Sequence, residues 1–154
     1  MNFKIFFFSV ICVLTFGTAF SQAAANPVKW EYSYEAINES EGYVVIKAKI
    51  EKDWHVYSQA VVADGPIPTS FQFISNASYE LVEKPSESPS EKVYSEMFGA
   101  DVASFSNEAV FKQKIRRKTK NEFSISAELE FMACNNSMCL PPKTIPFLVN
   151  IPAK

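Results

Sequence analysis

The chain has 154 residues, 47% of them hydrophobic, and its formal net charge at pH 7 is −2. This length suits one domain with a sizeable core, and the slightly acidic balance gives no electrostatic reason to expect binding to nucleic acid. The sequence has one histidine and three cysteines. One of these cysteines, Cys12, lies in the amino-terminal apolar run, and the histidine with the two other cysteines falls short of four zinc ligands unless a carboxylate joins them.

The first residues have the pattern of a secretory signal peptide. Lys4 supplies a short basic region, residues 5–16 are almost all apolar, and small residues follow. We expect cleavage after Ser21, so that residues 1–21 are removed, with a cut after Ala25 as the alternative. A retained anchor helix is disfavoured because the apolar run is shorter than the roughly 20 residues that span a bilayer.

Cleavage after Ser21 would leave a single exported domain, residues 22–154, without stable insertion in the membrane. Cys12 would be lost with the signal peptide, and Cys134 and Cys139 would remain. An even number of cysteines in an exported domain is typical of disulfide-bonded proteins in an oxidising compartment.

The exported part has the pattern of a series of short β-strands. Large apolar residues alternate with polar ones, which is the period of a half-buried strand, and no stretch has convincing helical periodicity. Strands are predicted at 28–34, 43–50, 54–58, 69–74, 79–82, 102–105, 109–115, 122–131 and 143–151. Pro146 marks the last one as an edge strand, because proline cannot donate to a ladder. The pattern favours an all-β sandwich, with a closed barrel as the alternative.

Two other segments have unusual compositions. Residues 84–92 are rich in Pro, Ser and Glu, which predicts an exposed loop. Residues 112–120 carry closely spaced lysines and arginines. Such a run indicates a solvated strand face and hairpin tip more readily than a polyanion-binding patch.

The segment from Cys134 to Pro142 is the strongest candidate site. Its two cysteines flank a polar loop and can form a disulfide if the backbone brings their Cα atoms within about 7 Å. The bridge is either a structural staple or a working redox pair. Its loop is so short that the bridge constrains little of the unfolded chain, and apolar Met132 and Met138 suit a docking surface. A Cys-x-x-Cys motif is absent, which excludes a thioredoxin-type active site.

Two further features each have a structural and a functional interpretation. His55 is either an ordinary strand residue beside Trp54 and Tyr57, or a group that stabilises a neighbouring thiolate. Met97 and Phe98 follow the solvated loop. They either anchor that loop in the core or cover a reactive group.

Three segments together resemble the amino-terminal periplasmic domain of DsbD, the transmembrane thiol:disulfide interchange protein. Cys134-Asn-Asn-Ser-Met-Cys139-Leu-Pro-Pro142 is similar to the family's Cys…Cys-aromatic-Pro-Pro signature, with a leucine in the aromatic position. Ser95-Glu96-Met97-Phe98-Gly99 resembles the family's cap loop, and Asp53-Trp54-His55-Val56-Tyr57 resembles its aromatic strand. The order and spacing of these segments match over roughly residues 30–151.

The resemblance implies an immunoglobulin-like antiparallel β-sandwich with a defined set of site residues. These are Cys134 and Cys139 as the redox pair, Glu96, Met97 and Phe98 as the cap loop, and His55 and Tyr57 near the sulfurs. The resemblance also implies that the second cysteine, Cys139, provides the sulfur that forms mixed disulfides.

The resemblance also implies oxidoreductase-like thiol–disulfide exchange in the periplasm, with no cofactor and no metal. Thioredoxin-fold proteins would be the electron donor and acceptor, and the acceptors would isomerise disulfides or serve cytochrome c maturation. We expect a free-standing relay that depends on a separate membrane reductase. Two competing hypotheses are a binding or structural β-sandwich with an inert disulfide, and a ligand-binding module with Trp54, Tyr57 and Phe98 as an aromatic platform.

Overall fold

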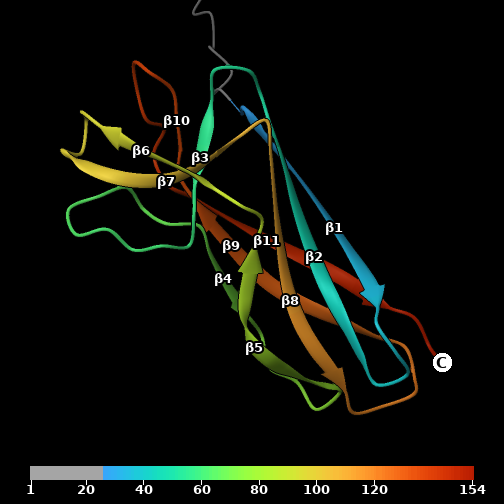
Figure 1. Cartoon of the computed structure of the whole chain (residues 1–154). Coiled ribbons are helices and arrows are strands. Elements are labelled where there is room, and N and C mark those ends of the chain that lie inside the picture. Colours follow the sequence, from blue (N-terminus) through green and yellow to red (C-terminus); the bar gives the residue numbers. More distant parts are fainter. Residues whose placement is uncertain (1–25) are drawn as a thin grey trace, which may run out of the picture.

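The computed structural model describes residues 26–154, and in this range it contains strands and turns but no helix (Figure 1). The strands are β1 (Val28–Ala36), β2 (Glu41–Ile50), β3 (His55–Tyr57), β4 (Ser70–Phe73), β5 (Tyr79–Glu87), β6 (Glu91–Ser95), β7 (Ala100–Ser106), β8 (Glu108–Arg117), β9 (Phe123–Phe131), β10 (Ala133–Cys134) and β11 (Lys143–Ile151). All their pairings are antiparallel. Residues 26–154 contain no helix of the length and hydrophobicity needed to span a bilayer.

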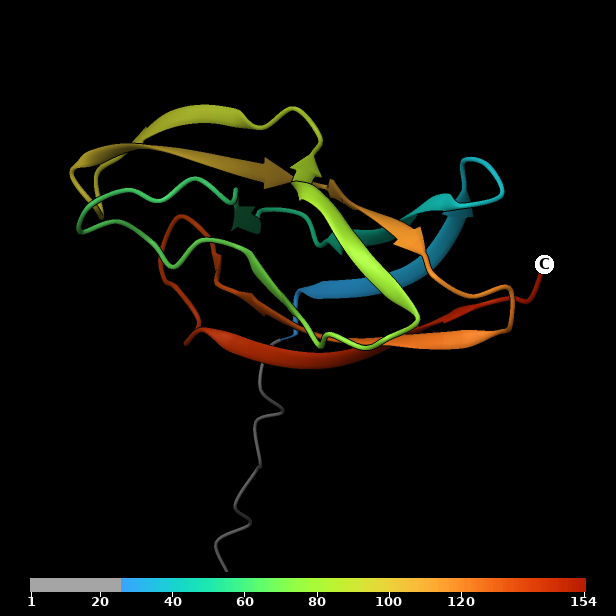
Figure 2. The same ribbon diagram turned by 90° about the horizontal axis from the view of Figure 1, so that it is seen from below.

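Two sheets stack face to face and make the body of the molecule. One has the strand order β1-β2-β8-β5 and the other β11-β9-β4. Figure 2 shows β9 and β11 forming the layer beneath β2, β5 and β8. The prediction of an all-β, immunoglobulin-like antiparallel sandwich is confirmed.

The core lies between these two layers and follows the alternation of the sequence. Strand β8 buries every second side chain, including Phe111 and Ile115, and β9 does the same with Ile125 and Leu129. Successive side chains of a strand point to opposite faces, so the buried half of each strand meets the facing sheet. The Phe111 ring lies 6.2 Å from that of Trp30, and such aromatic contacts add to the area that the core removes from water.

A third sheet, β10-β3-β7-β6, projects from one end of the sandwich (Figure 1). Each of its strands is adjacent in sequence to a strand of the sandwich: β3 follows β2, β6 follows β5, β10 follows β9, and β7 leads into β8. Two of these transitions occur at Asp53 and Asn107, whose φ angles are 67° and 66°. Asp and Asn are the non-glycine residues, with His, that adopt this conformation most readily. The third sheet is therefore an extension of the sandwich.

The prediction of an exposed loop over residues 84–92 is wrong. Strand β5 continues to Glu87 and β6 begins at Glu91, so only a short connection remains. The register of β5 shifts between Val82 and Ser86, which places Pro85 at a bulge in an edge strand, where proline is tolerated. This part of the strand is largely solvent-accessible, so its side chains need no apolar alternation. With β10 and β6 added, the strands outnumber the nine predicted.

Other local predictions are confirmed. Strand β11, which contains Pro146, is an edge strand. Lys112 and Lys114 of the basic run form ion pairs with Glu35 and Glu41 at 3.0 Å, as expected of a solvated face. Arg117 differs, because it is 7% exposed and donates hydrogen bonds to backbone carbonyls at the end of the sandwich.

Candidate functional site

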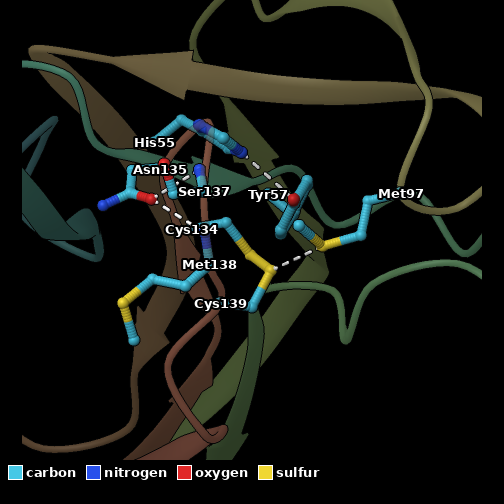
Figure 3. Close-up of a disulfide and its surroundings, with 8 residues drawn as sticks. All are labelled: His55, Tyr57, Met97, Cys134, Asn135, Ser137, Met138 and Cys139. Carbon is cyan, nitrogen blue, oxygen red and sulfur yellow. Dashed lines mark hydrogen bonds between the residues drawn. A yellow bond between two sulfur atoms is a disulfide. The ribbon is translucent and has the colours of Figure 1, made fainter.

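Cys134 and Cys139 are joined by a disulfide at the tip of the third sheet (Figure 3). Their Cα atoms are 4.0 Å apart, and the two residues form an isolated antiparallel bridge. Directly opposed residues come this close where a ladder has no hydrogen bond between them, so the side chains meet. The disulfide therefore crosses a very tight hairpin.

The residues between the cysteines make the hairpin turn. The Asn135 amide donates to the Met138 carbonyl at 2.9 Å. The Asn135 side-chain oxygen accepts from the amides of Ser137 and Met138, both at 2.9 Å. This is the way in which asparagine stabilises a turn through its own side chain. The polar residues that the sequence places between the sulfurs thus hold the two cysteines together.

The two sulfur-bearing residues differ in exposure. Cys134 is 1% exposed and packs in a small cluster with Tyr57 and Val102, whereas Cys139 is only partly buried at the margin of that cluster. Thiol–disulfide exchange requires access to the attacked sulfur. An incoming thiolate can therefore reach Cys139 far more easily than Cys134.

Strand β3 places His55 and Tyr57 beside the disulfide. Cys134 is the ladder partner of His55, and Tyr57 lies on the same face of β3 two residues on. The His55 Nε2 atom lies 3.1 Å from the Tyr57 hydroxyl, within hydrogen-bond distance. Burial lowers the pKa of His55 from 6.5 and raises the pKa of Tyr57 from 10.0. Both shifts favour the neutral side chains beside the sulfurs.

The loop between β6 and β7 covers the other side of the disulfide. It carries Glu96, Met97 and Phe98 and closes at Gly99, whose φ angle of 64° suits glycine. The Met97 sulfur lies 3.4 Å from the Cys139 sulfur (Figure 3). The Phe98 ring meets the Tyr57 ring edge-on, with 6.0 Å between ring centroids. We call residues 96–99 the cap loop.

A pocket of about 410 Å³ lies between the cap loop and Cys134. His55, Tyr57, Glu96, Met97 and Cys134 line it, together with Glu91, Ser104 and Ser106, which sequence reasoning missed. Ser104 and Ser106 are the β7 ladder partners of Tyr57 and His55. The alternation of β7 is the signal that could have found these serines once its pairing with β3 was known.

The structure brings together all seven residues that the sequence analysis selected. Glu96 is the most peripheral, because it is exposed at the rim of the pocket. Trp54 lies elsewhere: it packs against the main core, while Tyr57 and Phe98 belong to the small cluster beside Cys134. An aromatic platform of Trp54, Tyr57 and Phe98 is therefore not formed.

Comparisons with known proteins agree with this architecture. The family model for the N-terminal region of the thiol:disulfide interchange protein DsbD matches residues 22–150. A search of curated proteins returns no significant match.

Three solved structures share the fold at low sequence identity. The reduced N-terminal domain of DsbD from Neisseria meningitidis is 17% identical, with a TM-score of 0.51 over 79% of this chain and 84% of that one. The N-terminal periplasmic domain of ScsB from Proteus mirabilis is 12% identical, with a TM-score of 0.53 over 82% of this chain and 47% of that one. A complex between the N-terminal domains of DsbD and PilB from Neisseria meningitidis gives 16% identity and a TM-score of 0.50 over 77% of this chain and 80% of the matched one.

Proposed function

The chain belongs to the family of DsbD N-terminal domains, and from this we propose that it relays reducing equivalents between thioredoxin-like proteins through the Cys134–Cys139 disulfide. One observation carries the proposal beyond membership of the family. The disulfide joins the buried Cys134 to the more accessible Cys139, and the cap loop covers it. Met97 of this loop contacts the Cys139 sulfur, and Phe98 contacts Tyr57 beside Cys134.

The exchange begins at Cys139. A thiolate of the electron donor attacks the Cys139 sulfur, the bond to Cys134 breaks, and Cys134 leaves as a thiolate. The donor's second thiolate then attacks the donor sulfur of this mixed disulfide and releases Cys139. The donor has become a disulfide and this chain a dithiol, so two electrons have moved. The reverse sequence on an acceptor disulfide returns the chain to its resting form.

The surroundings of Cys134 support its role as leaving group. Strand β3 holds His55 in register with Cys134, and the Tyr57 hydroxyl lies in the same pocket. A hydrogen bond donated to a thiolate stabilises it, and the neutral imidazole or the hydroxyl can donate such a bond as the sulfur leaves. We assign His55 and Tyr57 as positioning residues for this step.

The cap loop controls access to the pair. Met97 covers the Cys139 sulfur and Phe98 rests on Tyr57, so a partner must displace the loop before its own sulfur can approach. Glu96 lies at the exposed rim, where a docking partner can contact it. Shielding of this kind slows exchange with small thiols but leaves exchange open to a protein that docks and displaces the loop.

The partners follow from the family and not from the geometry. We propose thioredoxin-fold proteins as donor and acceptor, a separate membrane reductase as the source of electrons, and acceptors that include proteins of cytochrome c maturation. The structure of a DsbD N-terminal domain in complex with the PilB N-terminal domain supports the proposal that a domain of this fold binds a protein partner. Residues 1–21, which lie outside the described residues, would direct export to the periplasm before removal. The exchange needs no cofactor.

The reduction potential of the Cys134–Cys139 pair tests the proposal. The purified protein would be equilibrated with glutathione or thioredoxin redox buffers, and the thiols counted by alkylation and mass spectrometry. We expect a potential between about −180 and −270 mV, the range of exchange proteins. A potential below about −300 mV, with no reaction toward thioredoxin-like reductants, would show an inert disulfide in a binding or structural module.

A further inference from the structure

Three sulfur atoms meet at the edge of the cap loop. The sulfurs of Cys134 and Cys139 are bonded to each other, and the Met97 sulfur lies 3.4 Å from that of Cys139 (Figure 3). When the disulfide is reduced, this corner of the molecule presents two thiols and a thioether. These come from two hairpins that the fold fixes against each other.

We propose that the reduced pair and Met97 form a three-sulfur site for a monovalent copper ion. Thiolate and thioether sulfurs are soft ligands of the kind that Cu(I), zinc and iron–sulfur clusters select. Copper in this state accepts two or three such ligands. The thioether supplies the third without adding charge.

The surroundings favour copper over zinc. Structural zinc takes four ligands, and among residues 26–154 no group of three or more His, Cys, Asp and Glu side chains is placed so that it could hold a metal ion. The nearest imidazole, His55, already has the Tyr57 hydroxyl within 3.1 Å. A site with only three soft donors fits Cu(I) better than it fits Zn(II).

Access and charge also suit a cation. Met97 is 53% exposed and Cys139 is partly exposed, so an ion or a copper-carrying thiol can reach the sulfurs from solvent. Glu91 and Glu96 line the adjoining pocket, and their carboxylates attract a cation. Because the cap loop carries Met97, loading would hold the loop closed over the pair.

Binding requires reduction and then loss of protons. A partner dithiol or an added phosphine reductant delivers two electrons and converts the disulfide to two thiols. Copper then replaces the thiol protons, which pass to solvent, and it remains in the monovalent state. The site needs only the reduced pair, so it goes beyond the relay function and does not depend on any partner.

The chain offers a matched control. Met138 is 49% exposed, close to the 53% of Met97, and it directly precedes Cys139. Its side chain nevertheless points away from the disulfide, whereas that of Met97 points at Cys139 (Figure 3). Leucine has a similar size and no sulfur, so Met97→Leu and Met138→Leu differ in whether they remove the third donor.

The test is a competition titration with Cu(I) and bicinchoninate, under anaerobic conditions, on the phosphine-reduced protein carrying Cys12→Ser. A thiol assay beforehand confirms that Cys134 and Cys139 are both free. We expect one copper per chain, three sulfur neighbours by X-ray absorption, and no such binding to the oxidised protein. Met97→Leu should weaken binding by about tenfold or more, the scale of losing a group that supports a metal site. Met138→Leu should leave the affinity unchanged.

Two results would overturn the site. Equal affinities of Met97→Leu and the parent protein would show that the thiolates bind copper without the thioether. Zinc binding as tight as copper binding would show that the site does not select a soft monovalent ion. Because both readouts use chemical reduction, they are independent of whether the pair exchanges electrons with proteins.

Discussion

Cys134 and His55 are direct partners in the antiparallel ladder between β10 and β3. Opposed side chains on one face of such a ladder have Cβ atoms about 5 Å apart. The imidazole, the only one in the chain, is therefore held next to the buried sulfur by backbone pairing. Its position does not depend on a side-chain contact that a partner could break.

His55 should make the stability of the fold depend on pH. Burial lowers its pKa below the ordinary value of 6.5, so the unfolded chain takes up the proton first as the pH falls. The contribution to stability is fully present above about pH 6.5 and is lost as the pH falls through the folded-state pKa. Denaturant unfolding at about pH 7.5 and pH 5 should show a larger loss for the wild type than for His55→Gln. Equal losses in the two proteins would contradict this assignment.

The exposure of the two sulfurs predicts unequal reactivity. In a background without Cys12, reduced Cys134→Ala leaves the accessible Cys139 thiol and Cys139→Ala leaves the buried Cys134 thiol. We expect Cys139 to alkylate with iodoacetamide at least about tenfold faster, since reactivity follows access. In denaturant the two rates should converge. Only Cys134→Ala should trap mixed disulfides with thioredoxin-like partners, and equal rates in the native proteins would refute the asymmetry.

Removal of the Phe98 ring should open the cap loop. Phe98→Ala removes the edge-on contact with Tyr57. It also removes about 1 kcal/mol of the free energy that burial of the apolar ring contributes. Reduction of the disulfide by dithiothreitol should become several-fold faster while the fold persists. Leu148→Ala removes an apolar side chain that is 57% exposed on β11 of the sandwich, so the reduction rate of this control should stay near that of the wild type. If both variants behave alike, the cap loop does not shield the pair.

Reduction of the disulfide should cost little stability. The bond closes a loop with a sequence separation of 5, for which loop entropy gives about 2 kcal/mol, against about 3 kcal/mol for a 15-residue loop. Guanidinium unfolding of oxidised and reduced wild-type protein should therefore show two cooperative transitions with close midpoints. Loss of the folded baseline on reduction would indicate a structural staple.

Gly42 lies in the sandwich, away from the disulfide, and should not tolerate a side chain for steric reasons. A Cβ atom at this position would collide with the Tyr34 ring, which lies across the glycine. Gly42→Ala should destabilise the sandwich by about 1–3 kcal/mol, the usual cost of overpacking. Adding Tyr34→Leu should recover part of this loss in a double-mutant cycle, while the reduction potential of the disulfide stays unchanged. Additive losses would mean that the two positions do not interact.

The sandwich was predictable because its strands are half buried. Strand β9 has Ile125, Ala127 and Leu129 on the core face and polar residues on the other, so its period of two is visible in the sequence. Strand β6 lacks this signal. Val93 and Tyr94 are 53% and 65% exposed, and no buried face imposes a pattern on them. Exposed edge strands are defined by their pairing partners, which a single sequence does not reveal.

The site was predictable only in part, and for a similar reason. The cysteines and their turn are local, since Asn135 stabilises the turn with its own side chain. The contact of Met97 with Cys139 joins residues 42 positions apart and depends on how two hairpins meet. Ser104 and Ser106 were missed because their place in the pocket depends on the register between β7 and β3.

The arrangement of the third sheet separates two events in the maturation of the protein. Closing the turn between Cys134 and Cys139 needs only a few neighbouring residues, and loops this short close on a submicrosecond timescale. The third sheet gathers strands that begin at His55, Glu91, Ala100 and Ala133, and such distant pairings form slowly. Closing of the turn does not wait for the third sheet, so an oxidant that acts on a newly exported, still unfolded chain finds the two thiols already close together. The presence of the bond in a cell extract therefore says nothing about whether the chain around it has matured.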